Sequence, residues 1–185
     1  MTAPPDDAWL VVIDAQRVFA DPTSPWGSVM WPDAVEPIRR LAKAFGDRAI
    51  FTRFVAHPQP TGSWVAYYEQ WPFALVPDDD PLYALVPEVA DLARHTVTAH
   101  TFGKWIPDLI AHAGTTPTLV LAGVSTDCCV ISTALPAADA GAHVLVVTDA
   151  CAGSSKEAHD NALSAMKLYE PQIELTTTDE VLAGR

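Results

Sequence analysis

The sequence is poor in the features that membrane spans and nucleic-acid sites need. No window approaches the roughly 18 consecutive apolar residues of a membrane-spanning helix. Lys and Arg number only 11 against 23 Asp and Glu, for a formal net charge of -12, whereas phosphate backbones are bound through clustered cations. We therefore expect no membrane segment and no nucleic-acid partner, and instead a small molecule or a protein as partner.

Cysteine is also scarce. The chain has three cysteines, of which Cys128 and Cys129 are adjacent, and it contains no C-x-x-C pair. Adjacent cysteines do not easily bridge each other, and no zinc motif remains. The N-terminal MTAPPDDAW lacks the basic and then apolar layout of a signal peptide. These absences predict reduced thiols and cytoplasmic localisation.

What the chain does contain is an alternation of short β-rich runs with longer helical periods. At 185 residues, with 49% hydrophobic, it predicts a single domain, residues 1–185. Repeated β-α units predict a three-layer α/β fold, with a mainly parallel sheet of roughly six strands and helices on both faces. The expected strands are 9–14, 48–53, 96–99, 118–124, 144–149 and 173–177. The expected helices are 33–45, 89–95, 106–113, 127–140 and one opened by a capping box at 154–157 and ending near 169.

One long segment, residues 54–87, breaks this alternation. It is rich in Pro, Trp and Tyr, and is therefore too aromatic for a disordered linker. Insertions of this kind in compact domains are often functional loops. We expect this segment to line the active site, although its aromatic residues could also simply cover the core.

Reactive residues follow two of the expected strands. Cys129 sits where the run TLVLAGV turns into a helix, and backbone N–H groups at a helix N-terminus favour a thiolate. Asp14 ends the first strand. Because ligands of open parallel sheets bind at the carboxyl ends of the strands, Asp14 and Cys129 are expected at one edge.

Four motifs stand out along the chain: VVIDAQ at 11–16, GVSTDCCV at 123–130, TALPAADAG at 133–141 and VVTDAC at 146–151. Together they resemble the motifs of the isochorismatase-like cysteine hydrolases, the superfamily that includes nicotinamidase and N-carbamoylsarcosine amidohydrolase. The resemblance spans nearly the whole chain and is weakest in the middle insertion. It implies hydrolysis of a C–N bond in a small molecule.

The resemblance also assigns roles. The family nucleophile immediately precedes the valine that starts the helix, which implies Cys129 rather than Cys128. Asp14 would be the general base and acid. A non-proline cis peptide would fall between Val124 and Ser125 and would direct the Ser125 and Cys129 N–H groups into one oxyanion hole.

The family lysine presents a difficulty. Counting back from Phe102 places it at Ala99, so the expected ammonium is missing. Three interpretations remain open: Lys104 supplies the ammonium from a shifted position, His100 replaces it, or Ala99 stands where a lysine was replaced, naturally or by an experimenter. The third fits HTVTxHTFGKW best and is the one we expect.

A metal is not expected. Nicotinamidases bind zinc through an Asp-x-His and a further His, and the region 52–58 has no Asp-x-His. The resemblance therefore implies a member that differs from a typical nicotinamidase and that uses no cofactor.

Aromatic side chains are expected to hold the substrate instead. We expect a wall drawn from Phe19, Trp26, Trp64, Tyr67, Tyr68, Trp71 and Trp105. Among these, Phe19, Trp71 and Trp105 are the predicted substrate contacts, together with Arg53 for a carboxylate or carbonyl and Gln16 to orient the site. Relatives often pair, so the resemblance also implies a homo-oligomer, a dimer or a tetramer.

Two alternatives to amide hydrolysis stay open. An isochorismatase-type enzyme would cleave a vinyl ether by acid chemistry and would need no cysteine. A catalytically silent binding member of the fold is the other alternative, and the empty lysine position is its support.

Overall fold

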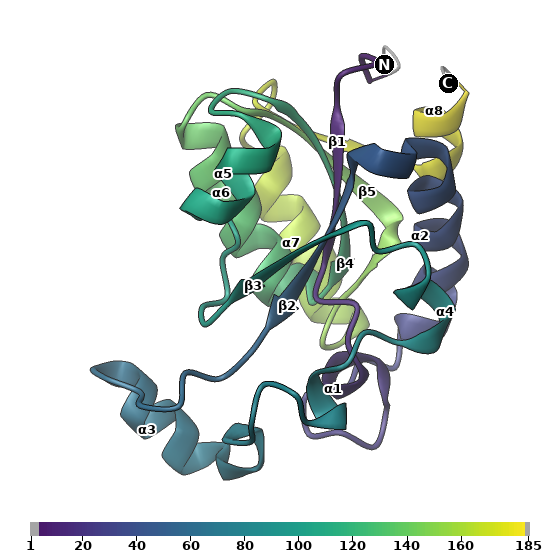
Figure 1. Cartoon of the computed structure of the whole chain (residues 1–185). Coiled ribbons are helices and arrows are strands. Elements are labelled where there is room, and N and C mark those ends of the chain that lie inside the picture. Colours follow the sequence, from purple (N-terminus) through teal and green to yellow (C-terminus); the bar gives the residue numbers. More distant parts are fainter. Residues whose placement is uncertain (1–3, 184–185) are drawn as a thin grey trace.

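A computed structural model describes residues 4–183 and contains one six-stranded sheet in the order β3-β2-β1-β4-β5-β6, in which every pairing is parallel. Helices cover both faces of the sheet (Figure 1), so the predicted three-layer α/β fold is confirmed. The strands are β1 (Trp9–Ile13), β2 (Ala49–Phe54), β3 (His95–Ala99), β4 (Thr118–Val124), β5 (His143–Ala152) and β6 (Ile173–Thr176).

The central strands β1 and β4 are buried because both of their faces are covered by helices. Leu10 and Val12 belong to the core cluster on one face of the sheet, and Val11 and Ile13 belong to the cluster on the other face. Gly123 lets the two strands meet closely. A Cβ atom at that position would lie 2.1 Å from the backbone oxygen of Ile13, and its φ is +112°. Only glycine fits this approach and conformation together.

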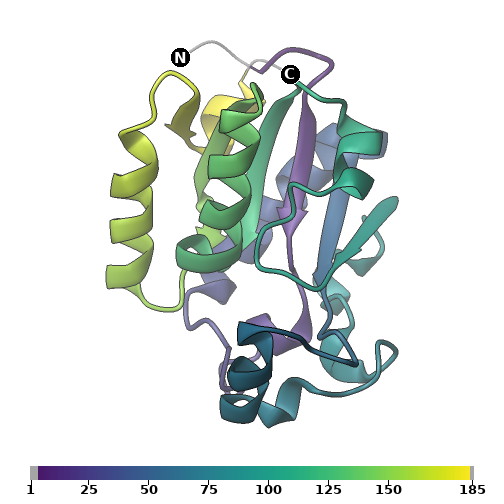
Figure 2. The ribbon, with the colours of Figure 1, turned by 90° about the vertical axis from the view of Figure 1, so that its left-hand side faces the viewer.

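The helices divide between the two faces. Figures 1 and 2 show α2 and α8 on one side of the sheet and α5, α6 and α7 on the other. The α-helices are α1 (Arg17–Ala20), α2 (Trp31–Phe45), α3 (Ser63–Gln70), α4 (Pro87–Ala90), α5 (Pro107–Ala113), α6 (Ile131–Asp139), α7 (Lys156–Lys167) and α8 (Thr178–Leu182). The short helices are η1 (Gly46–Arg48), η2 (Pro72–Ala74), η3 (Pro81–Tyr83) and η4 (Thr126–Val130), the last with π-helical turns. No helix among residues 4–183 is long and apolar enough to cross a membrane.

Three local expectations need correction. The helix expected at 89–95 is the short α4, which ends at Ala90, and His95 already belongs to β3. The helix expected at 127–140 starts with the π-helical η4 and becomes α-helical only at α6. The capping box expected at 154–157 is a simpler cap, because Ser155 accepts a hydrogen bond from the Ala158 N–H, without the reciprocal bond. A capping box does occur at the start of α8, between Thr177 and Glu180.

The aromatic insertion consists of short helices joined by irregular segments. It contains α3, η2 and η3 and connects β2 to α4. In Figure 1, α3 lies beyond the carboxyl ends of the strands and away from the body of the sheet. The insertion therefore stands at the edge of the sheet where parallel α/β folds bind ligands.

Candidate active site

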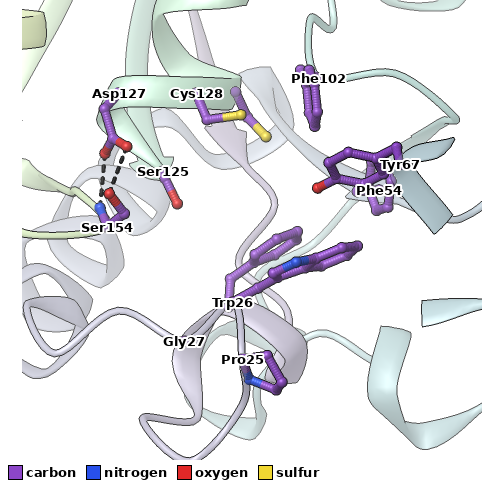
Figure 3. Close-up of a pocket in the computed structure, with 12 residues that line it drawn as sticks. Pro25, Trp26, Gly27, Phe54, Tyr67, Phe102, Ser125, Asp127, Cys128 and Ser154 are labelled. Carbon is purple, nitrogen blue, oxygen red and sulfur yellow. Dashed lines mark hydrogen bonds between the residues drawn. The ribbon is translucent and has the colours of Figure 1, made fainter. Parts of the chain in front are cut away.

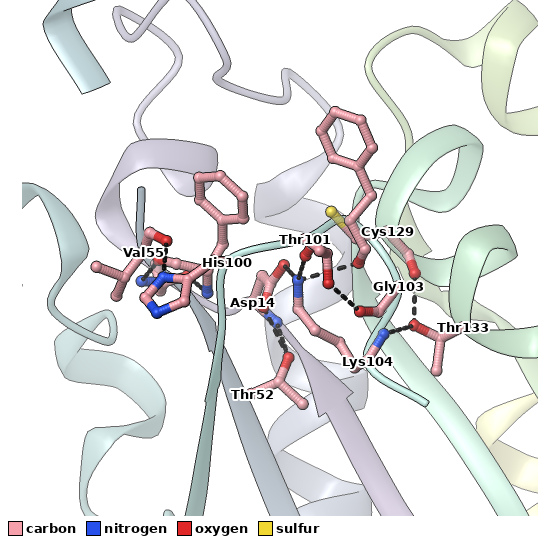
Figure 4. A network of polar contacts seen from close by, with 12 residues as sticks. Asp14, Thr52, Val55, His100, Thr101, Gly103, Lys104, Cys129 and Thr133 are labelled. Carbon is pink, nitrogen blue, oxygen red and sulfur yellow. Dashed lines mark hydrogen bonds and ion pairs between the residues drawn. The ribbon is translucent and has the colours of Figure 1, made fainter. Parts of the chain in front are cut away.

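Residues from three strand ends meet at one corner of the sheet. Asp14 follows β1, Cys129 lies in η4 after β4, and Lys104 lies in the segment after β3. Figure 4 shows these side chains together with Thr52 and Thr133, and we call these five residues the polar corner. All five are buried.

Asp14 is held through its backbone and both of its carboxylate oxygens. Its φ of 46° is the one positive value found at a non-glycine residue among residues 4–183. The Thr52 hydroxyl accepts from the Asp14 N–H at 3.1 Å and donates to Asp14 Oδ1 at 2.7 Å. Asp14 Oδ2 lies 2.9 Å from Lys104 Nζ and has no other hydrogen-bond partner in the described structure. This oxygen is therefore the one available to accept a proton.

Lys104 supplies the ammonium of the site. Its Nζ donates to the Thr101 carbonyl at 2.7 Å and the Phe102 carbonyl at 3.0 Å, and it pairs with Asp14, so three acceptors surround three N–H groups. The Lys104 N–H donates to the Thr133 hydroxyl, which itself donates to the Cys129 carbonyl. One threonine thus joins the lysine segment to the cysteine helix.

The expectation that the site lacks an ammonium is therefore wrong. Ala99 is the last residue of β3 and pairs with Phe54, whereas the ammonium arrives from Lys104. His100 does not replace it, because its Nδ1 bonds the Val55 carbonyl on the other side of the segment (Figure 4). Gly103 lets the segment that carries Lys104 come close to the backbone of α6, because a Cβ atom at position 103 would lie 2.5 Å from the Ser132 oxygen.

The turn that carries the two cysteines has an unusual backbone. The Val124–Ser125 peptide bond is cis, and the Ser125 carbonyl accepts hydrogen bonds from the N–H groups of both Cys128 and Val130. π-Helical turns are rare and occur frequently at functional sites. The structure thus has the strand, tight turn and helix that the sequence predicts around Cys129.

The two thiols differ in their ionisation. They share a hydrogen bond that lowers the pKa of Cys128 and raises the pKa of Cys129 well above its ordinary value. Burial and the carboxylate of Asp14 raise the Cys129 pKa further, while Lys104 lowers it. At rest Cys129 is therefore a thiol that needs a base.

A cavity of about 220 Å³ opens onto this thiol pair. Five aromatic side chains form its apolar side, which we call the aromatic wall: Phe19, Trp26, Phe54, Tyr67 and Phe102. Figure 3 shows Tyr67 and Phe54 on one side of the cavity, with Asp127 and Ser154 on the opposite side. The remaining lining residues are Pro25, Gly27, Ser125, Cys128 and Cys129.

Phe19 is the one predicted substrate contact that lines this cavity; four others do not. Gln16 is fully buried, and its side chain bonds the Phe54 N–H and the Phe54 and Tyr83 carbonyls, so it holds backbone rather than substrate. The Arg53 side chain instead pairs with Asp78 at 2.8 Å.

The two remaining tryptophans pack elsewhere. Trp71 stacks edge-on against Trp26, at a centroid distance of 6.2 Å, behind the cavity. Trp105 packs into the core cluster under α5 and α6. Their side chains are thus committed to the fold, and the sequence offers no sign of which face they would take.

Sequence reasoning missed several residues of the site. Thr52 lies within an ordinary strand, and Phe54 stands at its end, so neither carries a signal of its own. Asp127 and Ser154 lie within or beside the family motifs but were not considered as cavity residues. No group of three or more His, Cys, Asp or Glu side chains that could hold a metal ion occurs within residues 4–183.

Comparison with known proteins places this geometry in a family. The model of the isochorismatase domain matches residues 8–180. A stretch of 102 residues is 36% identical to isochorismatase domain-containing protein 2 of Xenopus laevis; it covers 52% of this chain and about half, 48%, of that relative.

Solved structures share the fold at low sequence identity. A cysteine hydrolase from Pseudomonas syringae pv. phaseolicola 1448A superposes with a TM-score of 0.80 at 20% identity, covering 100% of this chain and 97% of that one. A MAR1 ribonuclease from Caenorhabditis elegans gives 0.75 at 20%, covering 100% and 83%. An isochorismatase-like hydrolase from Alkaliphilus metalliredigens gives 0.76 at 18%, covering 95% and 96%. Because the model of the isochorismatase domain matches residues 8–180, nearly the whole chain, the chain belongs to the isochorismatase family.

Proposed function

We propose that this hydrolase cleaves a C–N bond of a small amide, imide or ureido compound through a thioester on Cys129. The observation that carries the proposal is the buried ion pair of Lys104 with Asp14, next to a cysteine that opens onto an apolar cavity. A carboxylate whose second oxygen is held by the lysine alone, beside a protonated thiol, is a base poised to activate a nucleophile.

The first half of the reaction forms the thioester. Asp14 Oδ2 takes the proton of the Cys129 thiol, and the sulfur attacks the substrate carbonyl carbon. The resulting oxyanion accepts hydrogen bonds from the backbone N–H groups of Ser125 and Cys129. When the C–N bond breaks, Asp14 returns its proton to the leaving nitrogen. Lys104 stabilises the negative charge that passes between sulfur and carboxylate.

The second half releases the acid. A water molecule gives a proton to Asp14, and its oxygen attacks the thioester carbonyl. The C–S bond breaks, the proton on Asp14 returns to the sulfur, and the acid product leaves. Each turnover thus consumes one water and restores both the Cys129 thiol and the Asp14 carboxylate.

The two alternatives lose support. A silent binding member rested on an absent ammonium, which Lys104 provides. Isochorismate, the vinyl ether that names the family, is a dicarboxylate, and no lysine, arginine or histidine is among the residues that line the cavity.

The test is to trap the intermediate. We expect Cys129→Ala to lose turnover by roughly a thousandfold or more in an ammonia-release screen of small amides. Intact-protein mass after acid quench should show an acyl adduct in the native enzyme and none in Cys129→Ala. Cys151→Ala, on the buried face of β5, is the matched control and should retain the adduct. Loss of the adduct in Cys128→Ala but not in Cys129→Ala would show that Cys128, and not Cys129, is the nucleophile.

A further inference from the structure

The cavity carries an uneven distribution of charge. Of the residues that line it, Asp127 is the one acidic or basic side chain. Asp127 Oδ1 accepts from the Ser154 N–H at 2.7 Å, and Oδ2 accepts from the Ser154 hydroxyl at 2.7 Å. Both bonds come from one residue on one side of the carboxylate, which fixes it at the cavity edge opposite Tyr67 (Figure 3). A ligand in this cavity therefore meets a held negative charge.

Neither Arg53 nor Lys104, the two cations at the carboxyl ends of β2 and β3, is free to meet a ligand. Arg53 pairs with Asp78 outside the cavity. Lys104 is fully buried behind the cysteine turn, with all three of its N–H groups directed at protein acceptors. A carboxylate group of a ligand would thus find no cation among the lining residues, and burying a charge without an opposite charge is costly. The net charge of -12 adds a long-range repulsion of anions.

The opposite side of the cavity fits a flat apolar group. The rings of Phe19 and Trp26 are stacked within 9° of parallel at a centroid distance of 6.0 Å. Phe54 and Tyr67 stand close to Trp26, at 5.8 Å each. A volume of about 220 Å³ is below the range of about 300–1,000 Å³ typical of drug-sized ligands. The space suits a molecule with a single ring or one of similar size.

We propose that the substrate is a small, flat amide-type compound that carries no negative charge, neutral or cationic, and that Asp127 is the specificity-determining residue that rejects carboxylates. This inference rests on the proposed function for the amide group. The preference for ligands without negative charge follows from the residues that line the cavity, and it can be measured by binding without any reaction.

Three probes of the same shape test the charge rule: benzamidinium, benzamide and benzoate. Binding is measured by isothermal titration calorimetry with the Cys129→Ala variant, in which no turnover occurs. At low salt we expect benzoate to bind about tenfold more weakly than benzamide or worse, and benzamidinium at least as tightly as benzamide, the size expected for one partly screened charge a few ångströms away. Added salt should narrow the difference.

Asp127→Asn tests the residue. Asparagine keeps the shape and can accept from the Ser154 N–H while donating to the Ser154 hydroxyl, so the Ser154 contacts should survive. We expect benzoate and benzamidinium to bind this variant with affinities within about threefold of each other. Asp160→Asn, an equal charge change on the exposed face of α7, is the matched control and should keep the native order.

The outcomes separate the two proposals. Benzoate binding as tightly as benzamidinium to Cys129→Ala, or an unchanged order in folded Asp127→Asn, overturns the charge rule even if Cys129 forms an adduct with amides. Failure of all three probes to bind up to their solubility limits overturns the flat-ring assignment. If Asp127→Asn does not fold, the probe order in Cys129→Ala still decides the charge rule. An adduct test that fails while the probe order holds overturns only the cysteine mechanism.

Discussion

The polar corner and the aromatic wall meet at the cavity, which the corner reaches through Cys129, and they are built by opposite means. The corner gathers side chains from the strands, from the segments that follow them and from α6, and it is joined by directed bonds, such as Lys104 to Asp14 at 2.9 Å and Thr52 to Asp14 at 2.7 Å. Apart from Phe54 at the end of β2, the wall comes from segments that connect the strands, and its rings meet at centroid distances such as 5.8 Å between Trp26 and Tyr67. The loss of a single directed bond in a buried site is therefore costly, whereas the energy of ring contacts is spread over many atoms and falls little when one ring is removed.

The largest effect that tests this contrast is expected from Lys104→Met, in the polar corner. Methionine keeps the length but leaves the Asp14 carboxylate buried without its cation, which should cost about 3–5 kcal/mol of unfolding free energy. Turnover should fall by roughly a thousandfold. Because Lys104 lowers the pKa of Cys129, the pH at which the thiol alkylates half-maximally should rise, measured in a Cys128→Ala background.

The exposed face offers a control for that change. Lys156→Met removes a lysine from the exposed i, i+4 ion pair with Asp160 on α7. Pairs of this kind are worth a few tenths of a kcal/mol, so stability and alkylation should stay near the native values. Equal losses in Lys104→Met and Lys156→Met would show that the corner has no special dependence on its cation.

Gln16 links the two regions, and Gln16→Leu should come next in size. Leucine is similar in volume but leaves the Phe54 N–H and two backbone carbonyls without their bonds. We expect a loss of about 3 kcal/mol in urea unfolding, from unsatisfied buried groups. Gln59→Leu is the control, since its exposed side chain makes no hydrogen bond among those found in the structure. A Gln16→Leu protein as stable as Gln59→Leu would refute the link.

The smallest effect is expected in the wall, from Tyr67→Ala on α3. Removing one of five rings should raise KM about fivefold to tenfold, with kcat nearly unchanged, because the ring contacts bound substrate and not the reacting atoms. Steady-state kinetics on the best amide from the ammonia-release screen measures both. Val65→Ala, exposed on the same helix and outside the cavity, should change neither constant. A drop in kcat with KM unchanged would show that Tyr67 acts in the chemical step, together with the residues of the polar corner.

The same contrast explains what the sequence could predict. The strands, the parallel sheet, Asp14 and Cys129 follow from hydrophobic runs and from motifs that sit at strand ends, where backbone direction leaves little choice. Thr52 was missed because a buried threonine in a strand resembles its neighbours until its partner is known.

Side chains on irregular segments escaped prediction for a different reason. Lys104 was undervalued because its reach depends on how close Gly103 lets the segment come to Ser132, a tertiary contact. Arg53 was overvalued because its competing partner, Asp78, lies in the insertion and is distant in sequence. Only three of the seven aromatic residues expected in the wall line the cavity, because composition does not give the direction of a side chain.

The origin of Lys104 has a consequence for how relatives are sorted. A comparison by aligned columns would record an alanine at the position where the resemblance to the family implies a lysine and would classify this chain as inactive, although its ammonium is 2.9 Å from the carboxylate. An alanine in this column should therefore be checked against the segment that follows before it is taken as loss of activity.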